Sequence, residues 1–216
     1  MQNTVDQLFT QLDNWRYLPA YALERRVDIY FSLYLKEIFQ NKYHKHLDVI
    51  IQEFPLRIGS IEENALGTNL SKKIDFVGID QTAREVFLIE LKTDMRSRRV
   101  KQDEYLLKAQ KINVPGLVDG IIQIYKATKQ KTKYNYLIKV LESLEWLKKD
   151  GKTFQNASHV YRISIIYIQP TNEGNEANTI CFDDIISLLH AKEDAFSKRF
   201  AKSLELWKMN PNNKKL

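Results

Sequence analysis

Apolar side chains near the amino terminus recur at helical spacing in two consecutive stripes. The first stripe consists of Val5, Leu8, Phe9, Leu12 and Trp15. The second stripe lies within residues 20–43, and Pro19 stands just before it. Proline has a fixed φ and no N–H, so it suits the first turn of a helix and not its interior. The pattern predicts two helices, over residues 5–15 and 20–43.

The next segments of the chain have the apolar pattern of β-strands. Residues 47–58 alternate in apolar character, and two further apolar runs occupy residues 73–77 and 86–92. Pro55 cannot donate a ladder hydrogen bond, so we expect the first strand to lie at a sheet edge or to contain a bulge. The polar stretch 60–71 is predicted to be the loop between the first strand and the second.

Helical spacing returns after residue 92. The expected elements are helices over residues 97–112, 117–125 and 134–147, a strand over 160–169, a short edge strand over 178–182, and C-terminal helices from Asp183 onward and over 196–207. Residues 113–116 end the first of these helices, and Asp150 with Gly151 closes the third. Asp183 is the expected N-cap of its helix. Helices on a small mixed sheet predict an α/β layer fold.

The candidate chemistry lies on the two strands on either side of residues 80–85. If Asp80 pairs with Glu85 in an antiparallel hairpin, Asp75 stands opposite Glu90 with the Cβ atoms ~5 Å apart. Side chains two residues apart on a strand share a face, so Lys92 points the same way as Glu90. The predicted register brings two carboxylates and an ammonium together.

Two carboxylates side by side need a compensating charge. Like charges opposed across a ladder destabilise it, and buried carboxylates require a partner or a metal. A divalent cation would relieve the repulsion, and hard oxygen ligands suit Mg²⁺. The alternative is a salt-bridged surface strand, because a motif as short as Glu-x-Lys also arises by chance. The continuous apolar run over residues 86–89 is typical of a strand covered on both faces, which favours the metal site.

Composition restricts the class of protein. Of the 216 residues, 44% are hydrophobic and 28% are charged, which indicates a globular chain. We expect one domain over residues 1–209 and a disordered basic tail over 210–216. The sequence predicts neither a membrane span nor a signal peptide. Cys181 is the only cysteine and cannot form an intrachain disulfide, which is typical of cytoplasmic proteins.

Positive charge predominates and favours a polyanionic partner. The net charge is +6 and the pI is about 9.2. One basic cluster directly follows the motif strands and consists of Arg96, Arg98, Arg99 and Lys101. Solvated helix faces would explain basic stretches elsewhere. Beside a phosphate-handling site, this cluster is expected to contact a nucleic-acid backbone.

The order of elements and the three central residues resemble the PD-(D/E)XK nuclease superfamily. Its restriction-endonuclease-like core is a helix, a three-stranded antiparallel meander, a helix and a further strand. Its signature is an Asp on the second core strand and Glu-x-Lys on the third, which Asp75 and Glu90-Leu91-Lys92 match in type and order. The resemblance covers about residues 20–170, with Ile74 in place of the Pro of the family name.

The resemblance implies metal-dependent cleavage of phosphodiester bonds, with Mg²⁺ as the usual cofactor and Mn²⁺ as a substitute. Asp75 and Glu90 would bind the metal together with the Leu91 carbonyl. Lys92 would assist the attacking water.

Further residues are implied on the helices before and after the motif. Many members place a Glu from the first core helix near the metal, and Glu24 is the candidate here, with Asp28 one turn later as its rival. Some members carry a Gln and a Tyr on the helix after the Lys. Gln102 and Tyr105 are similar to these and would contact nucleic acid.

We therefore expect a Mg²⁺-dependent nuclease that acts on DNA in preference to RNA. The sequence leaves the oligomeric state open, and a homodimer is compatible with it. Two alternatives stay open. One is a catalytically inactive nucleic-acid-binding module with the same fold. The other is a helical interaction protein whose acidic residues are structural.

Overall fold

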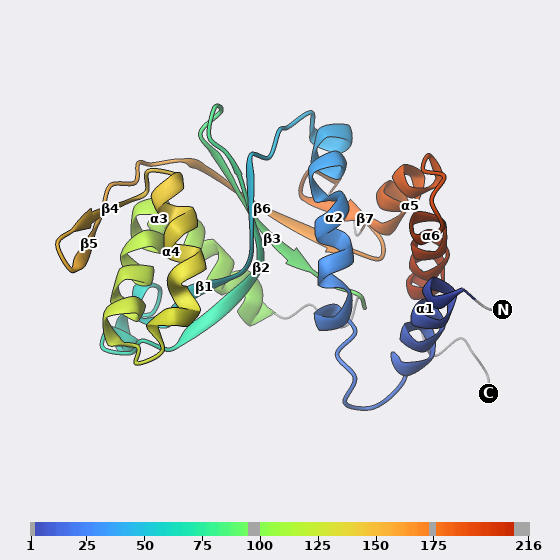
Figure 1. Ribbon diagram of the computed structural model, residues 1–216, viewed down its shortest axis with the longest axis horizontal. Helices are drawn as coiled ribbons and strands as arrows, with labels where there is room; N and C mark the ends of the chain where they lie inside the picture. Colours follow the sequence, from blue (N-terminus) through green and yellow to red (C-terminus); the bar gives the residue numbers. More distant parts are fainter. Residues whose placement is uncertain (1–2, 95–99, 173–175, 210–216) are drawn as a thin grey trace. The chain divides into compact units, whose positions relative to one another are not determined.

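The computed structural model describes residues 3–94, 100–172 and 176–209, and Figure 1 shows how the elements follow one another. It contains a five-stranded sheet in the order β1-β2-β3-β6-β7. These strands are β1 (Val49–Arg57), β2 (Ser71–Asp80), β3 (Glu85–Leu91), β6 (Arg162–Gln169) and β7 (Thr179–Cys181). β1 and β3 both run antiparallel to β2, whereas β7 runs parallel to β6. The predicted mixed α/β architecture is confirmed, and β1, which carries Pro55, lies at a sheet edge as expected.

The helices occur where the apolar stripes predicted them, with changed bounds. They are α1 (Thr4–Trp15), α2 (Glu24–Tyr43), α3 (Val100–Ala127), α4 (Asn135–Ser143), α5 (Phe182–His190) and α6 (Ala195–Lys208). Short 3-10 turns are η1 (Ile58–Ser60), η2 (Glu63–Ala65), η4 (Lys131–Tyr134) and η5 (Glu176–Asn178). Asn113 has φ 59° and ψ −174°, which breaks α3 at the predicted boundary between two helical segments.

The central hairpin has the predicted register. Asp80 pairs with Glu85, and the ladder continues to Phe76 opposite Ile89. Every residue of β3 is buried, as expected for a strand covered on both faces. The apolar run around Leu88 therefore correctly predicted a buried strand, β3.

The prediction of a helix reaching residue 147 was wrong. α4 ends at Ser143, and Glu145 adopts a left-handed conformation with φ 59°. The chain then forms a hairpin of β4 (Leu147–Asp150) with β5 (Thr153–Asn156). Gly151, which was expected to close a helix, lies in the hairpin turn with φ 57°, a conformation that costs glycine little.

Two helix starts also differ from the expectation. α2 begins at Glu24 and not at residue 20, because residues 16–23 form a mostly exposed linker of turns. α5 begins at Phe182, so Asp183 lies inside the helix and is not its N-cap. Cys181 is the N-cap, and its backbone N–H donates to the Asp184 carboxylate at 2.9 Å. The Asp184 carboxylate, in the first turn of α5, thus accepts a hydrogen bond from a backbone N–H that has no acceptor within the helix.

The chain divides into two compact units. Unit 1 comprises Met1–His46, Glu90–Arg99 and Ile166–Leu216, and unit 2 comprises Leu47–Ile89 and Val100–Ile165. The chain passes from one unit to the other inside β3 and inside β6. The single domain expected over residues 1–209 stays a prediction, and the tail at 210–216 lies outside the described residues.

Each unit has its own core. In unit 1, α6 packs against α1 and α5, and α2 packs against α5. Aromatic rings fill the space between these helices, and the fully buried ones include Phe9, Phe31, Phe182, Phe200 and Trp207. In unit 2, α3 packs on β1 and on β5.

The cap of α6 gives a prediction about acid stability. Asp194 accepts hydrogen bonds from the Ser197 hydroxyl at 2.6 Å and its backbone N–H at 2.8 Å, and these bonds lower the pKa of Asp194 below its ordinary 3.8. A lowered pKa in the folded state adds stability above pH 3.8, which is lost as the pH falls through the lowered value. Asp194→Ala should cost about 1 kcal/mol at pH 7 and less near pH 2. Urea unfolding at both pH values measures this, and an equal cost at both would contradict it.

Candidate active site

The core of the candidate site is a buried ion-paired group in unit 1. Glu90 lies at the end of β3, Lys92 follows it directly, and Glu24 is the first residue of α2. The backbone N–H of Lys92 donates to the Ile168 carbonyl of β6 at 2.7 Å, which fixes the chain where it leaves β3. Three elements that are distant in sequence therefore position these side chains.

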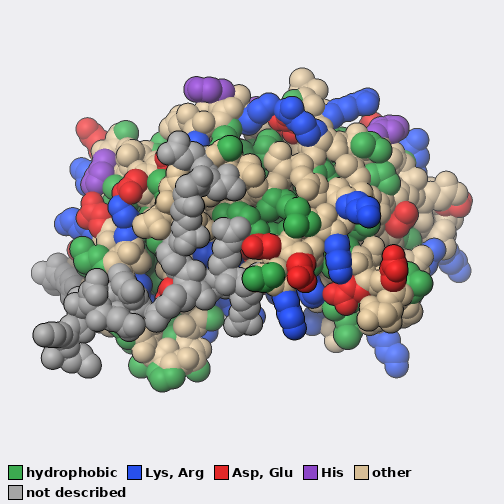
Figure 2. Space-filling model, turned by 180° about the vertical axis from the view of Figure 1, so that it is seen from behind, with side chains coloured by type: hydrophobic (Ala, Val, Ile, Leu, Met, Phe, Trp, Pro, Cys, Tyr) green, Lys and Arg blue, Asp and Glu red, His purple; other side chains and the backbone are tan. Residues whose placement is uncertain are grey.

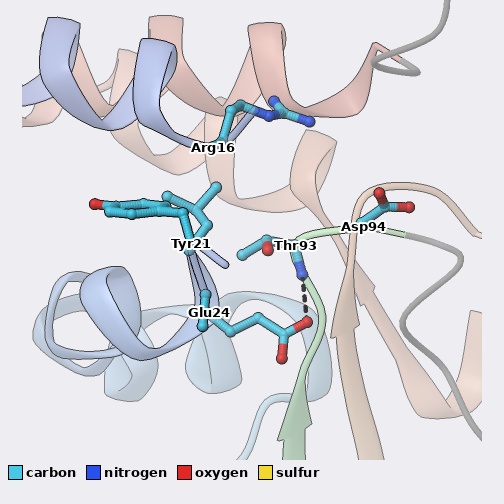
Figure 3. Close-up of a pocket in the computed structure, with 7 residues that line it drawn as sticks. Arg16, Tyr21, Glu24, Thr93 and Asp94 are labelled. Atoms are coloured by element: carbon cyan, nitrogen blue, oxygen red, sulfur yellow. Dashed lines mark hydrogen bonds between the residues drawn. The ribbon is translucent and has the colours of Figure 1, made fainter. Parts of the chain in front are cut away.

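The Lys92 ammonium lies between two carboxylates. Its Nζ is 3.0 Å from Glu90 Oε1 and 3.8 Å from Glu24 Oε2. Only 2% of Glu90 and 4% of Lys92 is exposed, whereas Glu24 is half-buried. The Thr93 backbone N–H points at Glu24 Oε1 from 3.4 Å, as Figure 3 shows. The sequence predicts Glu24, Glu90 and Lys92 as members of one site, and in the structure the carboxylates of both Glu residues lie within 4 Å of Lys92 Nζ.

The donor chemistry of this group suits a hard cation. Carboxylate oxygens are hard donors, and Glu24 and Glu90 supply two such groups. Mg²⁺ binds through one or two carboxylates and keeps several waters, so Glu24 and Glu90 fit this ion. Within the described ranges, no group of three or more His, Cys, Asp and Glu side chains is arranged to hold a metal.

Asp75 lies on β2 in unit 2 and is half-buried. Strand alternation places it on the same face as Val77, which pairs with Leu88 of β3. β1 pairs with the other edge of β2. The residues on either side of Asp75 have partners there: Phe76 pairs with Gln52 and Ile74 pairs with Phe54. Glu53 lies between these two partners and is therefore the β1 residue across from Asp75.

Glu53 is a residue of this region that the sequence analysis missed. Its φ is 52°, which is uncommon for a residue other than glycine and tends to occur at functional or strained positions. Its carboxylate is 2.6 Å from Lys73 Nζ. The register of β1 against β2 crosses a long loop, so no local signal in the sequence could have placed Glu53 next to Asp75.

The remaining residues of the expected site have different environments. Arg96, Arg98 and Arg99 lie outside the described residues, and Lys101 is exposed on α3. Leu91, the source of the expected carbonyl ligand, is 1% exposed.

The two α3 residues expected to contact nucleic acid lie in unit 2. Gln102 is half-buried. Tyr105 is 8% exposed, its hydroxyl donates to the Lys73 carbonyl at 3.3 Å, and Lys72 Nζ lies 5.1 Å from the ring centroid. These contacts pack Tyr105 against β2 and leave little of its ring for a ligand.

Exposed positive charge gathers elsewhere in unit 2. The seven lysines of residues 126–149 are all exposed and are Lys126, Lys129, Lys131, Lys133, Lys139, Lys148 and Lys149. On the face drawn in Figure 2, basic and acidic side chains are interspersed. The side chains drawn on that face therefore do not form one continuous basic patch.

A cavity of about 260 Å³ lies beside the ion-paired group in unit 1. Its lining consists of Arg16, Tyr21, Ala22, Leu23, Glu24, Thr93 and Asp94. Figure 3 shows Arg16 reaching over the cavity from the linker after α1, with Glu24 and Asp94 at other parts of the wall. The linker has no periodic pattern, so the sequence analysis missed Arg16 and Tyr21.

Arg16 is held firmly in this wall. Its guanidinium donates to the Leu206 and Trp207 carbonyls at the end of α6, each at 3.3 Å. Burial lowers the pKa of Arg16 from its ordinary value, and the negative charges of Asp94 and Asp13 oppose that effect. Arginine stays protonated under such shifts, so the cavity has a permanent positive charge in its wall.

Comparisons of the chain with protein-family models, with curated proteins and with solved structures find no match. In the part of the chain that the structure describes, each helix is too short or too polar to cross a membrane. The interpretation of the site therefore rests on its own geometry.

The buried pair of Glu90 and Lys92 gives a prediction about coupling. Removing one member of a buried ion pair leaves an uncompensated charge, which costs about 3–5 kcal/mol, whereas replacing both by apolar groups costs much less. Glu90→Leu and Lys92→Met should each lower the free energy of unfolding by about that amount. The double variant should lose clearly less than their sum. Urea unfolding of the four proteins measures the coupling, and simple additivity would contradict the pairing.

Proposed function

We propose that this protein is a Mg²⁺-dependent nuclease that hydrolyses phosphodiester bonds of DNA. The observation that carries the proposal is the buried Lys92 ammonium, within 4 Å of the carboxylates of both Glu90 and Glu24. Such a group is costly as structure alone, and buried clusters of charged side chains beside a cavity are typical of active sites. The order α2-β1-β2-β3-α3-β6 supports a restriction-endonuclease-like core.

Asp75 keeps the role that the resemblance implies, as a further carboxylate ligand of the metal. The ladder of β2 with β3 runs from Asp80 opposite Glu85 to Phe76 opposite Ile89, which is the register that the sequence predicts. This agreement supports the proposed role of Asp75, and the cleavage test below examines it.

Each residue would have a distinct role. Glu90, Glu24 and Asp75 would hold the cation, with the Leu91 carbonyl as a further ligand. Bound Mg²⁺ would supply Lewis-acid stabilisation of phosphate charge and a water of lowered pKa. Lys92 carries three N–H donors and no acceptor, so it can hold the oxygen of the attacking water or of the phosphate but cannot take a proton. The proton of the water then has to pass to a carboxylate or to solvent.

The nucleic acid would be held by positive charge at exposed positions. The lysines of residues 126–149 and Lys101 support this, because contacts to phosphates supply most of the affinity of non-specific binding. Single-cysteine composition supports a cytoplasmic location.

A catalytically inactive nucleic-acid-binding module is the second candidate. The observation that favours it is the set of exposed lysines over residues 126–149, because nucleic-acid binding alone would account for them. Such a module would bind nucleic acid with a steep salt dependence and would not cleave it.

The first test is cleavage by site variants. Asp75→Ala and Lys92→Met should each reduce Mg²⁺-dependent DNA hydrolysis by at least about 10²-fold, because each removes a group that acts on the developing charge. Labelled single-stranded and duplex DNA, with RNA as a comparison, provide the substrates, and circular dichroism confirms the fold. Full activity of Asp75→Ala would refute the assignment. Binding without cleavage by the unaltered protein in both Mg²⁺ and Mn²⁺ would favour the inactive module.

The second test is thermal stabilisation by Mg²⁺ without any substrate. A ligand that binds only the folded state at a hundred times its Kd stabilises it by about 2.7 kcal/mol, or roughly 5–10 °C for a chain of this length. Glu24→Ala should lose most of this rise in Tm. Asp28→Ala is the matched control, because it removes an acid one helical turn away on α2. A full Mg²⁺-dependent rise in Tm in Glu24→Ala would exclude Glu24 as a ligand, and a loss confined to Asp28→Ala would assign the ligand to Asp28 instead.

A further inference from the structure

We propose that the linker between α1 and α2 is a stacking surface for single-stranded nucleic acid. In this arrangement, unpaired bases lie on the exposed rings of the linker and the neighbouring arginine side chains pair with the backbone phosphates. The proposal rests on the proposed nuclease function and adds the substrate class to it. Every residue that carries it belongs to unit 1.

Exposed aromatic rings gather on this linker. Trp15 is 44% exposed and Tyr17 is 46% exposed, and the half-buried ring of Tyr21 meets that of Trp15 edge-on with the centroids 6.0 Å apart. The two other tryptophans of the chain, Trp146 and Trp207, are 2% and 1% exposed. Trp15 is therefore the one exposed tryptophan, and its exposure is specific to this linker.

Cationic side chains alternate with these rings. The Arg16 guanidinium carbon lies 5.4 Å from the centroid of Tyr17, and that of Arg26 lies 5.8 Å from the centroid of Tyr21. Arg25 is exposed beside Arg26 at the start of α2. Rings that stack on bases and cations that pair with phosphates are the two parts of a single-strand binding surface.

The adjoining cavity takes no part in this surface. Its wall carries the carboxylates of Glu24 and Asp94 and one guanidinium, that of Arg16, so it offers a phosphate no net positive charge. Both terminal nitrogens of Arg16 donate to α6 carbonyls. Glu24 belongs both to this wall and to the ion-paired group, so the linker with its rings lies beside the proposed metal site.

A purely structural role explains only part of these observations. Arg16 helps to hold the end of α6, where a cation is favourable. That role does not require exposed rings at Trp15 and Tyr17. A duplex keeps its base faces stacked inside, so aromatic faces can stack only on unpaired bases. The combination favours a single strand, such as an overhang or a frayed end.

Tryptophan fluorescence tests the proposal directly, because Trp15 is the exposed reporter. The full-length protein is titrated in EDTA, which prevents cleavage, with a thymidine oligonucleotide, with an abasic strand of the same length and with a blunt duplex. The thymidine strand should quench Trp15 emission and protect it from iodide, and the abasic strand and the duplex should do neither. Trp15→Phe should abolish the signal. Binding of the thymidine strand, seen by anisotropy, without any change in Trp15 emission would overturn the proposal.

Affinity variants provide the second measurement. Trp15→Leu and Tyr21→Leu should each weaken thymidine-strand binding by about 5- to 150-fold, which corresponds to the loss of one stacked base. Leu33→Ala is the control, since Leu33 is an exposed apolar side chain on α2 of unit 1, outside the linker and outside the lysine-rich segment 126–149. Equal affinities of all three variants would refute the stacking surface. If cleavage is never observed but the Trp15 signal and these losses are, the surface stands and the nuclease proposal fails. Cleavage with an unresponsive Trp15 would instead support the nuclease and refute the stacking surface.

Discussion

The buried ammonium of Lys92 is the constraint on which the rest of the candidate site depends. An ammonium with 4% exposure is stable only if carboxylates approach it closely. One carboxylate comes from Glu90 two residues earlier, so the end of β3 supplies its own partner. The second comes from Glu24, which requires α2 to begin beside the end of this strand. The start of α2 also favours an acid there, because the helix dipole is positive at its amino end.

The residues of the ion-paired group belong to a single unit. The chain leaves unit 2 after Ile89 and enters unit 1 at Glu90, so Glu90, Lys92 and Glu24 all belong to unit 1. Asp75 and Glu53 belong to unit 2. The face to which each strand side chain points depends on register, because a slip of one residue would turn it to the opposite face.

Aromatic residues serve two purposes in unit 1. One set, which includes Phe200 and Phe31, is fully buried and holds the helices together. Trp15, Tyr17 and Tyr21 lie in or beside the linker and leave ring surface exposed or half-exposed. Arg16 and Arg26 lie next to the rings of Tyr17 and Tyr21, whereas the buried rings of the core pack against one another. Composition alone could not separate these groups, since both use the same residue types.

The sequence by itself determined the local features of this protein. Apolar periodicity predicted α1, α6 and the five sheet strands, and the Asp80–Glu85 turn predicted the hairpin register, because these features depend on neighbours in the chain. The tertiary structure decided where contacts between distant segments compete with local pattern. It ended α4 at Ser143 through a left-handed Glu145, although Leu141, Leu144 and Leu147 continue the helical spacing. It placed Glu53 across from Asp75, and it joined Arg16, Tyr21 and Thr93 around one cavity. Such groupings depend on how distant elements pack, and no local spacing of residues encodes that packing.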